Sequence, residues 1–257
     1  MCLIAFAYKT HPVYELVFAA NRDEFYSRPT RPAKFWGTDP DMLAGKDLEA
    51  GGTWMGINTL GEFAAVTNFR DMSNVMNNVP TRGKLVTEYL IRPENTETYL
   101  QQIHKDAGRY NGFNLLAGTV DRLWYYSNAK RNITAVDPGI HGLSNHLLNT
   151  SWVKVERARQ ALATELKKEM ITGEELFELL KDDRPAPDDA LPDTGLTFEI
   201  EKAVSPVFIK TEKYGTRCST ILLIDKQGHV TFEERCYLSG TTELKEKNRY
   251  DFQIKLR

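Results

Sequence analysis

The chain opens with the stretch CLIAFAYKTHPVYELVFAANRDE, which occupies residues 2–24. Its two apolar runs, Leu3–Tyr8 and Tyr14–Ala20, are separated by a polar segment with His and Pro, a composition typical of a turn. We therefore expect a β-hairpin whose first strand begins at Cys2. If the two runs pair, the NRDE tetrad that ends the second strand (Asn21-Arg22-Asp23-Glu24) lies next to Cys2.

Outward from this hairpin, the sequence predicts further hairpins with helices grouped between them. The hairpins are expected at Thr53–Asn58 with Glu62–Thr67, at Phe113–Thr119 with Arg122–Ser127, and at Ser219–Asp225 with His229–Cys236. The helices are expected at Gly83–Ile91, at Glu94–Asp106, at Trp152–Glu169 with Ser151 as N-cap, and at Glu174–Lys181. This order favours an α+β fold with mainly antiparallel sheets, as one domain over residues 1–257.

Two smaller features of this pattern concern single segments. The short turn in the last predicted hairpin would place Cys218 opposite Cys236. The segment Asp182–Gly195 is rich in Asp and Pro, which favours an exposed loop. That loop is interpreted either as a solvated connector or as a lid over a pocket.

Composition and charge narrow the class of protein. The 257 residues include 33 Lys and Arg against 35 Asp and Glu, so the net charge is 33 − 35 = −2. Hydrophobic residues make up 41%, which argues against a disordered chain, and the lack of a basic excess argues against a nucleic-acid binder. No apolar run reaches the roughly 18 residues of a membrane span. Three cysteines without a signal peptide give no disulfide framework, so we expect a cytoplasmic protein without integral membrane association.

Cys2 is the position with the clearest chemical meaning. Removal of Met1 would leave one residue that carries both a thiol and a free α-amine. A thiol with a pKa near ~8.5 needs a base at neutral pH, and an α-amine with a pKa of about 7.7–8 can accept its proton. This predicts an N-terminal cysteine nucleophile. The alternative is a buried structural cysteine on an apolar strand.

Several polar residues could complete such a site. Within the tetrad, a carboxylate could hold the α-amine and a guanidinium could lower the pKa of the thiol. Arg217 precedes an apolar strand, and an arginine in that position usually has a partner. Asn68 and Asn145 follow strand-like segments, where their amides could stabilise an oxyanion. The tetrad could equally be a charged surface turn, and either asparagine taken alone is better explained as a turn residue.

These features belong to a wider set of motifs. The set comprises Cys2, the NRDE tetrad with Arg28-Pro29, Gly51-Gly52-Thr53-Trp54-Met55-Gly56-Ile57-Asn58, Thr67-Asn68-Phe69-Arg70, Arg82-Gly83-Lys84-Leu85-Val86, Leu143-Ser144-Asn145 and Gly215-Thr216-Arg217-Cys218-Ser219-Thr220. Together and in this order the motifs resemble the NRDE-motif family, also called transport and Golgi organisation proteins. That family is similar to the N-terminal-nucleophile (Ntn) hydrolases, nearest the penicillin V acylase and bile salt hydrolase group.

The resemblance implies a four-layer α-β-β-α sandwich and a role for each site residue. Cys2 matches the acylase nucleophile, Asp23 matches the aspartate that contacts its amine, and Arg217 matches the arginine behind the thiol. Asn68 and Asn145 match the asparagines of the oxyanion site.

One position departs from the acylase pattern. Ala20 stands where those acylases carry an arginine. Arg22 is the candidate replacement, although we expect its side chain on the other face of the extended strand.

Two functions follow from this reading. The first is an amidohydrolase that cleaves a non-peptide C–N bond of a small or lipid-like amide through an acyl-thioester, without a metal or an organic cofactor. The second is a non-catalytic protein of the same fold that carries a lipid or a cofactor such as haem, because eukaryotic family members have been linked to such handling and to secretory organisation. Cys2 and its partners favour the first, and Ala20 favours the second. The sequence is compatible with a homo-oligomer and predicts no nucleic-acid partner.

Overall fold

The computed structural model describes residues 2–92 and 94–254, and their contacts divide the chain into two compact units. The first unit contains Met1–Ser27, Pro138–Ser144 and Leu148–Phe252. The second contains Arg28–Asp137, Asn145–Leu147 and Gln253–Arg257. The expectation of one domain over residues 1–257 stays a prediction, since two compact units can belong to one domain.

A six-stranded sheet organises the first unit, in the order β10-β1-β2-β11-β12-β13. Its strands are β1 (Cys2–Tyr8), β2 (Tyr14–Phe25), β10 (Gly139–Leu143), β11 (Tyr214–Asp225), β12 (His229–Tyr237) and β13 (Leu244–Gln253). The β1–β10, β1–β2, β2–β11 and β11–β12 pairs are antiparallel. Two interior strands, β1 and β2, are therefore the predicted N-terminal hairpin.

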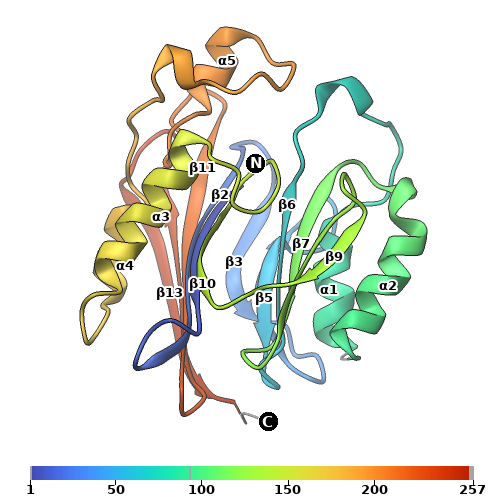
Figure 1. Cartoon of the computed structure of the whole chain (residues 1–257), viewed down its shortest axis with the longest axis vertical. Helices are drawn as coiled ribbons and strands as arrows, with labels where there is room; N and C mark the ends of the chain where they lie inside the picture. The colour runs from blue at the N-terminus through green and yellow to red at the C-terminus, as the bar shows by residue number, and fades with distance from the viewer. Residues whose placement is uncertain (1, 93, 255–257) are drawn as a thin grey trace. The chain divides into compact units, whose positions relative to one another are not determined.

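Helices cover one face of this sheet (Figure 1). They are α3 (Val153–Glu165) and α4 (Gly173–Leu179), and the unit also contains the short helix α5 (Phe198–Ala203) and the 3-10 helix η3 (Asp188–Ala190). Leu3, Ala5 and Ala7 of β1 pack in one apolar cluster with Val155 and Phe177.

Successive side chains of a strand point to opposite faces of the sheet. Leu3, Ala5 and Ala7 face the helices, so the residues between them and before them point to the opposite face. That opposite face therefore carries Cys2, Ile4 and Phe6. A Cβ added at Gly142 of β10 would come within 2.6 Å of Val155 Cγ1, so only glycine lets α3 approach this closely.

A seven-stranded sheet organises the second unit, in the order β3-β4-β5-β6-β7-β8-β9. Its strands are β3 (Thr30–Phe35), β4 (Met42–Asp47), β5 (Met55–Asn58), β6 (Phe63–Asn68), β7 (Phe113–Gly118), β8 (Leu123–Ser127) and β9 (Asn132–Ala135). All neighbouring strands pair antiparallel. Strands that follow one another in the sequence are also neighbours in this sheet. Helices lie in the chain between β6 and β7.

The inserted helices pack on one face of the second sheet (Figure 1). They are α1 (Gly83–Ile91) and α2 (Thr96–Asp106), with the 3-10 helices η1 (Met72–Asn74) and η2 (Ala107–Arg109) beside them. Val86, Leu90 and Leu100 are buried in one cluster with Val66 and Leu115 of the sheet. Each unit thus combines one mainly antiparallel sheet with a helical layer, which confirms the predicted α+β class.

The structure confirms most of the predicted elements and corrects several boundaries. β2 continues to Phe25, so the NRDE tetrad lies inside the strand and not after it. β11 begins at Tyr214, so Arg217 also lies inside a strand.

The predicted helix over Trp152–Glu169 is shorter than expected. It runs from Val153 to Glu165, and Ser151 is not its N-cap. Trp152 takes the N-cap position with an extended backbone and makes no side-chain capping hydrogen bond.

Some elements were not predicted at all. These are β3, β4, β9, β10, β13 and α5. The Asp182–Gly195 segment is largely irregular, as expected, and contains only the short η3. Among the described residues, no helix is both long enough and apolar enough to cross a membrane.

Candidate active site

Cys2 and Arg22 lie directly opposite each other on β1 and β2. Opposite residues of an antiparallel pair project to the same face, so both side chains share the face away from α3 and α4. Arg22 is two residues from Ala20 and therefore points the same way as that position. The expectation that Arg22 points to the other face was wrong, because the strand runs through the tetrad without a shift in register against β1.

Groups from two other segments lie next to Cys2. The Asp23 backbone amide of β2 lies beside it and lowers the pKa of its thiol. The Ser144 hydroxyl donates to the Cys2 carbonyl at 3.0 Å. Burial raises the pKa of the Cys2 thiol, while the Arg22 charge and the Asp23 N–H act in the opposite direction. The thiol is therefore protonated at neutral pH and needs a proton acceptor before it can attack.

Asp23 is buried beside two polar groups of the same unit. The Thr216 hydroxyl donates to Asp23 Oδ1 at 2.7 Å. Burial raises the pKa of the Asp23 carboxyl, and the Lys154 charge, the Thr216 hydrogen bond and Arg22 oppose that shift. Lys154 lies on α3 with only 2% of its surface exposed, and its Nζ donates to the Val204 carbonyl at 3.0 Å. A buried lysine thus supplies the main positive charge that favours ionised Asp23.

Arg217 lies at an irregularity of the β2–β11 pairing. The register pairs Thr216 with Asp23 and Cys218 with Arg22, so Arg217 is the extra residue of a β-bulge. Its Nη1 donates to the Phe25 carbonyl at 3.1 Å. Burial and the nearby Arg22 charge lower the pKa of Arg217. The bulge therefore brings a second guanidinium close to Arg22.

The two predicted oxyanion residues both lie in the second unit. Asn68 is the last residue of β6, and Asn145 is fully buried. The Asn145 side-chain amide donates to the Asn68 carbonyl at 3.0 Å. The Arg70 N–H donates to the Asn145 carbonyl at 2.7 Å. The structure thus brings Asn68 and Asn145 together, and Asn145 directly follows Ser144, the residue that contacts Cys2.

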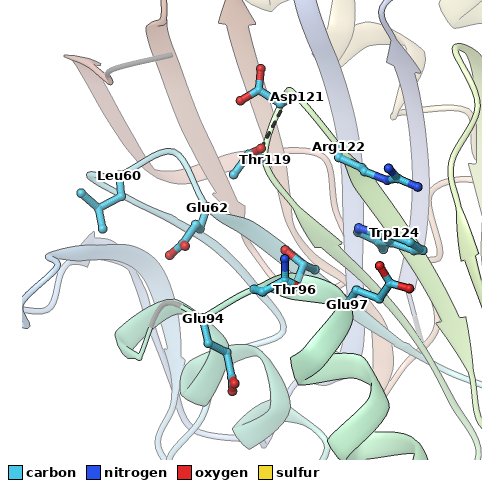
Figure 2. Close-up of a pocket in the computed structure, with 10 residues that line it drawn as sticks. Leu60, Glu62, Glu94, Thr96, Glu97, Thr119, Asp121, Arg122 and Trp124 are labelled. Atoms are coloured by element: carbon cyan, nitrogen blue, oxygen red, sulfur yellow. Dashed lines mark hydrogen bonds between the residues drawn. The ribbon is translucent and has the colours of Figure 1, made fainter. Parts of the chain in front are cut away.

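The second unit also contains a cavity of about 560 Å³ (Figure 2). Its lining includes Glu62, Glu94, Glu97 and Asp121, with the Arg122 guanidinium 4.6 Å from the centre of the Trp124 ring. None of the predicted site residues lines this cavity. In residues 2–92 and 94–254, no group of three or more His, Cys, Asp or Glu side chains is arranged to hold a metal ion.

The sequence analysis missed three residues that surround the predicted set. Ser144 and Thr216 lie inside quoted motifs but received no role. Lys154 was not considered, although its spacing from Ala158 and Leu162 places it on the buried face of α3. A lysine on an otherwise apolar helix face is the signal that could have identified it.

Comparisons with known proteins identify the family. A family model described as Transport and Golgi organisation 2 matches residues 1–239. The Transport and Golgi organization protein 2 homologs of Bos taurus and Homo sapiens are each 36% identical to the chain, and each match covers 99% of both sequences. The chain belongs to the Transport and Golgi organisation 2 family. The Drosophila melanogaster protein of that name is 26% identical over 91% of each chain, so members this distant retain the same overall length.

Solved structures show the fold to which this family member is similar. A mutant of the conjugated bile acid hydrolase from Clostridium perfringens matches with a TM-score of 0.55 and 11% identity, over 98% of this chain and 92% of that one. A second variant of the same hydrolase matches with a TM-score of 0.53 and 11% identity, over 100% of this chain and 99% of that one. At this identity the likeness shows the fold alone, which is that of an Ntn hydrolase.

Proposed function

We propose that this chain is an N-terminal cysteine amidohydrolase that cleaves a linear amide of a small or lipid-like substrate in the cytoplasm. The observation that carries the proposal is the position of Cys2. It begins β1 directly opposite Arg22, and the Arg22 charge and the Asp23 backbone amide both act to lower the pKa of its thiol. An N-terminal nucleophile needs a fixed strand end with polar neighbours, and this arrangement provides one.

The proposed reaction begins once Met1 has been removed and Cys2 carries the free α-amine. The neutral amine takes the thiol proton, and the thiolate attacks the amide carbonyl carbon. The raised pKa of the Cys2 thiol is the reason that this base is required. We assign to Asp23 the task of holding the resulting ammonium, and to Arg22 and Arg217 the stabilisation of the thiolate.

The tetrahedral intermediate carries a negative oxygen that needs hydrogen-bond donors. We assign the side-chain amides of Asn68 and Asn145 to this role, in line with the family resemblance. The ammonium then protonates the departing amine, which leaves an acyl-thioester on Cys2. Water, deprotonated by the same α-amine, attacks the thioester and releases the acid, so the enzyme returns to its starting state.

The test uses p-nitroanilides of short and long fatty acyl chains as probes. We expect wild-type protein to release p-nitroaniline and to carry an acyl group on Cys2 in a mass spectrum of the quenched enzyme. Cys2→Ser should lose at least about 10³-fold in turnover while probe binding persists. Cys236→Ser is the matched control and should keep the wild-type rate.

Other outcomes would contradict the proposal. Equal turnover by wild-type and Cys2→Ser protein, or acylation at a residue other than Cys2, would exclude Cys2 as nucleophile. Binding of the probes without turnover by the processed wild-type protein would favour the carrier function. Ala20 also supports that function, because it stands where the acylases carry an arginine.

A further inference from the structure

All three cysteines of the chain lie in one row across the first sheet. Cys2 pairs with Arg22, Arg22 pairs with Cys218, and Cys218 pairs with Cys236. Directly opposite residues share a face, so these four side chains project to the same side of the sheet. Each sulfur is a free thiol in the structure. The proposed nucleophile uses only Cys2, which leaves two neighbouring thiols without a role.

Cys218 and Cys236 lie close enough to form a disulfide. Directly opposite residues on antiparallel strands have Cα atoms about 4.5–5.5 Å apart, and disulfides need roughly 4.4–6.8 Å. The neighbouring Cys236 thiol, together with burial, raises the pKa of Cys218. The pair can therefore be bridged by side-chain rotation, without movement of β11 or β12.

Cys2 is on the same face but cannot take part in this bridge. It lies on β1, and β2 separates it from β11. Two strand spacings amount to about 10 Å, which exceeds the roughly 7 Å limit for a disulfide. The Arg22 side chain also occupies the position between Cys2 and Cys218 in the row.

The two thiols differ in their access to solvent. Cys218 is 6% exposed, whereas Cys236 is half-buried. The Cys236 thiol donates a hydrogen bond to Glu234 Oε1 across 3.8 Å. An oxidant in solution therefore meets Cys236 first, and Cys218 is positioned behind it as the resolving thiol.

We propose that Cys218 and Cys236 form a second reactive site, a dithiol that a hydroperoxide oxidises reversibly to a disulfide. The Cys236 sulfur attacks one peroxide oxygen, the O–O bond breaks, and a sulfenic acid forms while an alcohol or water departs. The Cys218 sulfur then attacks the Cys236 sulfur, the S–O bond breaks, and the hydroxide leaves with the Cys218 proton as water. The pair loses two electrons and two protons, and a small thiol reverses the change by exchange.

The experiment uses the full chain with Cys2→Ser, so that only this pair can react. The protein is treated with hydrogen peroxide, denatured, alkylated, and analysed by mass spectrometry. We expect a loss of two hydrogens, two fewer alkylated cysteines, and one peptide pair that links Cys218 to Cys236. Dithiothreitol should restore both thiols.

Two matched variants separate the steps. With Cys218→Ser added, Cys236 should accumulate as a sulfenic acid that dimedone traps. With Cys236→Ser added, Cys218 should stay reduced because it is buried. Peptide mapping of peroxide-treated wild-type protein gives the same answer if a double variant fails to fold.

The proposal would be overturned if peroxide left both thiols alkylatable, if Cys236 accumulated as sulfenic acid with Cys218 still present, or if the disulfides were between molecules. These outcomes are independent of the proposed hydrolase, since the measurement needs neither Cys2 nor a substrate.

Discussion

The two sheets bury different kinds of polar side chain. Among the described residues, those of the first unit that are buried and charged are Arg22, Asp23, Lys154, Glu201, Glu233, Glu234 and Arg235. The second unit buries mostly amides and hydroxyls, such as Asn58, Asn114 and Asn145, with Glu62 and Arg70 as its charged members. A buried charge costs far more than a buried amide unless it has partners. Burial of polar side chains therefore costs more free energy in the first unit than in the second. The first unit is also the one that contains Cys2.

Breaking a buried charge pair in the first unit should give the largest effect. Glu233 is 2% exposed and accepts from Arg235 Nε at 2.8 Å, while Arg235 also pairs with Glu174. Glu233→Ala leaves the buried Arg235 with Glu174 as its remaining carboxylate partner. We expect a loss of about 3 kcal/mol in the free energy of unfolding. Chemical denaturation measures it.

Glu174 provides the matched control for the same guanidinium. Its side chain is 67% exposed, so Glu174→Ala should cost only about 0.2–1 kcal/mol. Equal losses for Glu233→Ala and Glu174→Ala would show that burial does not set the cost of these pairs.

The second unit should affect turnover more than stability. If Asn68 donates to the oxyanion, Asn68→Ala should lower kcat about 10²–10³-fold, or roughly 2.7–4 kcal/mol, with KM for the p-nitroanilide little changed. Asn132→Ala on β9, an exposed asparagine of the same unit, should leave both constants unchanged. A kcat loss of less than tenfold for Asn68→Ala would remove that residue from the oxyanion site.

Asp23 should make stability depend on pH in an uncommon direction. Burial raises the pKa of Asp23 in the fold above its ordinary value of 3.8, so the folded protein holds this proton more tightly than the unfolded chain does. Stability from this group is therefore lost as the pH rises from 3.8 through the raised pKa. Asp23→Asn should remove that decline and unfold at an equal or higher temperature at pH 7, with no turnover.

Asp182 is the matched opposite case in the same unit. The Arg184 hydrogen bond lowers the pKa of Asp182, so its stabilisation is present at neutral pH and is lost on acidification. Asp182→Asn should thus be less stable than wild type at pH 7, with the difference shrinking at low pH. Thermal unfolding of both variants across pH distinguishes the two signs, and identical profiles would contradict the account of Asp23.

The smallest effects should come from hydroxyls buried in the second sheet. The Tyr125 hydroxyl donates to Asn114 Oδ1 at 2.7 Å, whereas no hydrogen-bond partner is found for the Tyr126 hydroxyl among the described residues. Tyr125→Phe should cost about 1 kcal/mol and Tyr126→Phe about zero, or slightly stabilise. Urea denaturation compares the pair, and a larger loss for Tyr126→Phe would contradict this assignment.

Local signals in the sequence explain which elements could be predicted. The β1–β2 hairpin combines two apolar runs with a clear turn, and α1 has the predicted bounds Gly83–Ile91. By contrast, β13 is mostly exposed and charged, and β3 contains Pro32, so neither shows the alternation typical of a strand. Both are edge strands, and each is held by pairing with a single neighbour, β4 for β3 and β12 for β13.

In the candidate site, too, some features could be predicted from local sequence signals and others could not. The proximity of Cys2 and the NRDE tetrad followed from hairpin pairing alone. The bulge at Arg217 depends on how β11 pairs with β2, and the contribution of Lys154 to the charge around Asp23 depends on how α3 packs on the sheet. Neither can be inferred from residue spacing within one element.

The central claim is that Cys2 becomes the terminal residue and lends both its sulfur and its nitrogen to the reaction. Mass spectrometry of the N-terminal peptide from the natural, untagged protein tests it most directly. The account predicts a peptide that begins at Cys2 with an unmodified α-amine. A peptide that retains Met1, or one whose Cys2 amine is acetylated, would contradict it, because the proposed base would then be missing.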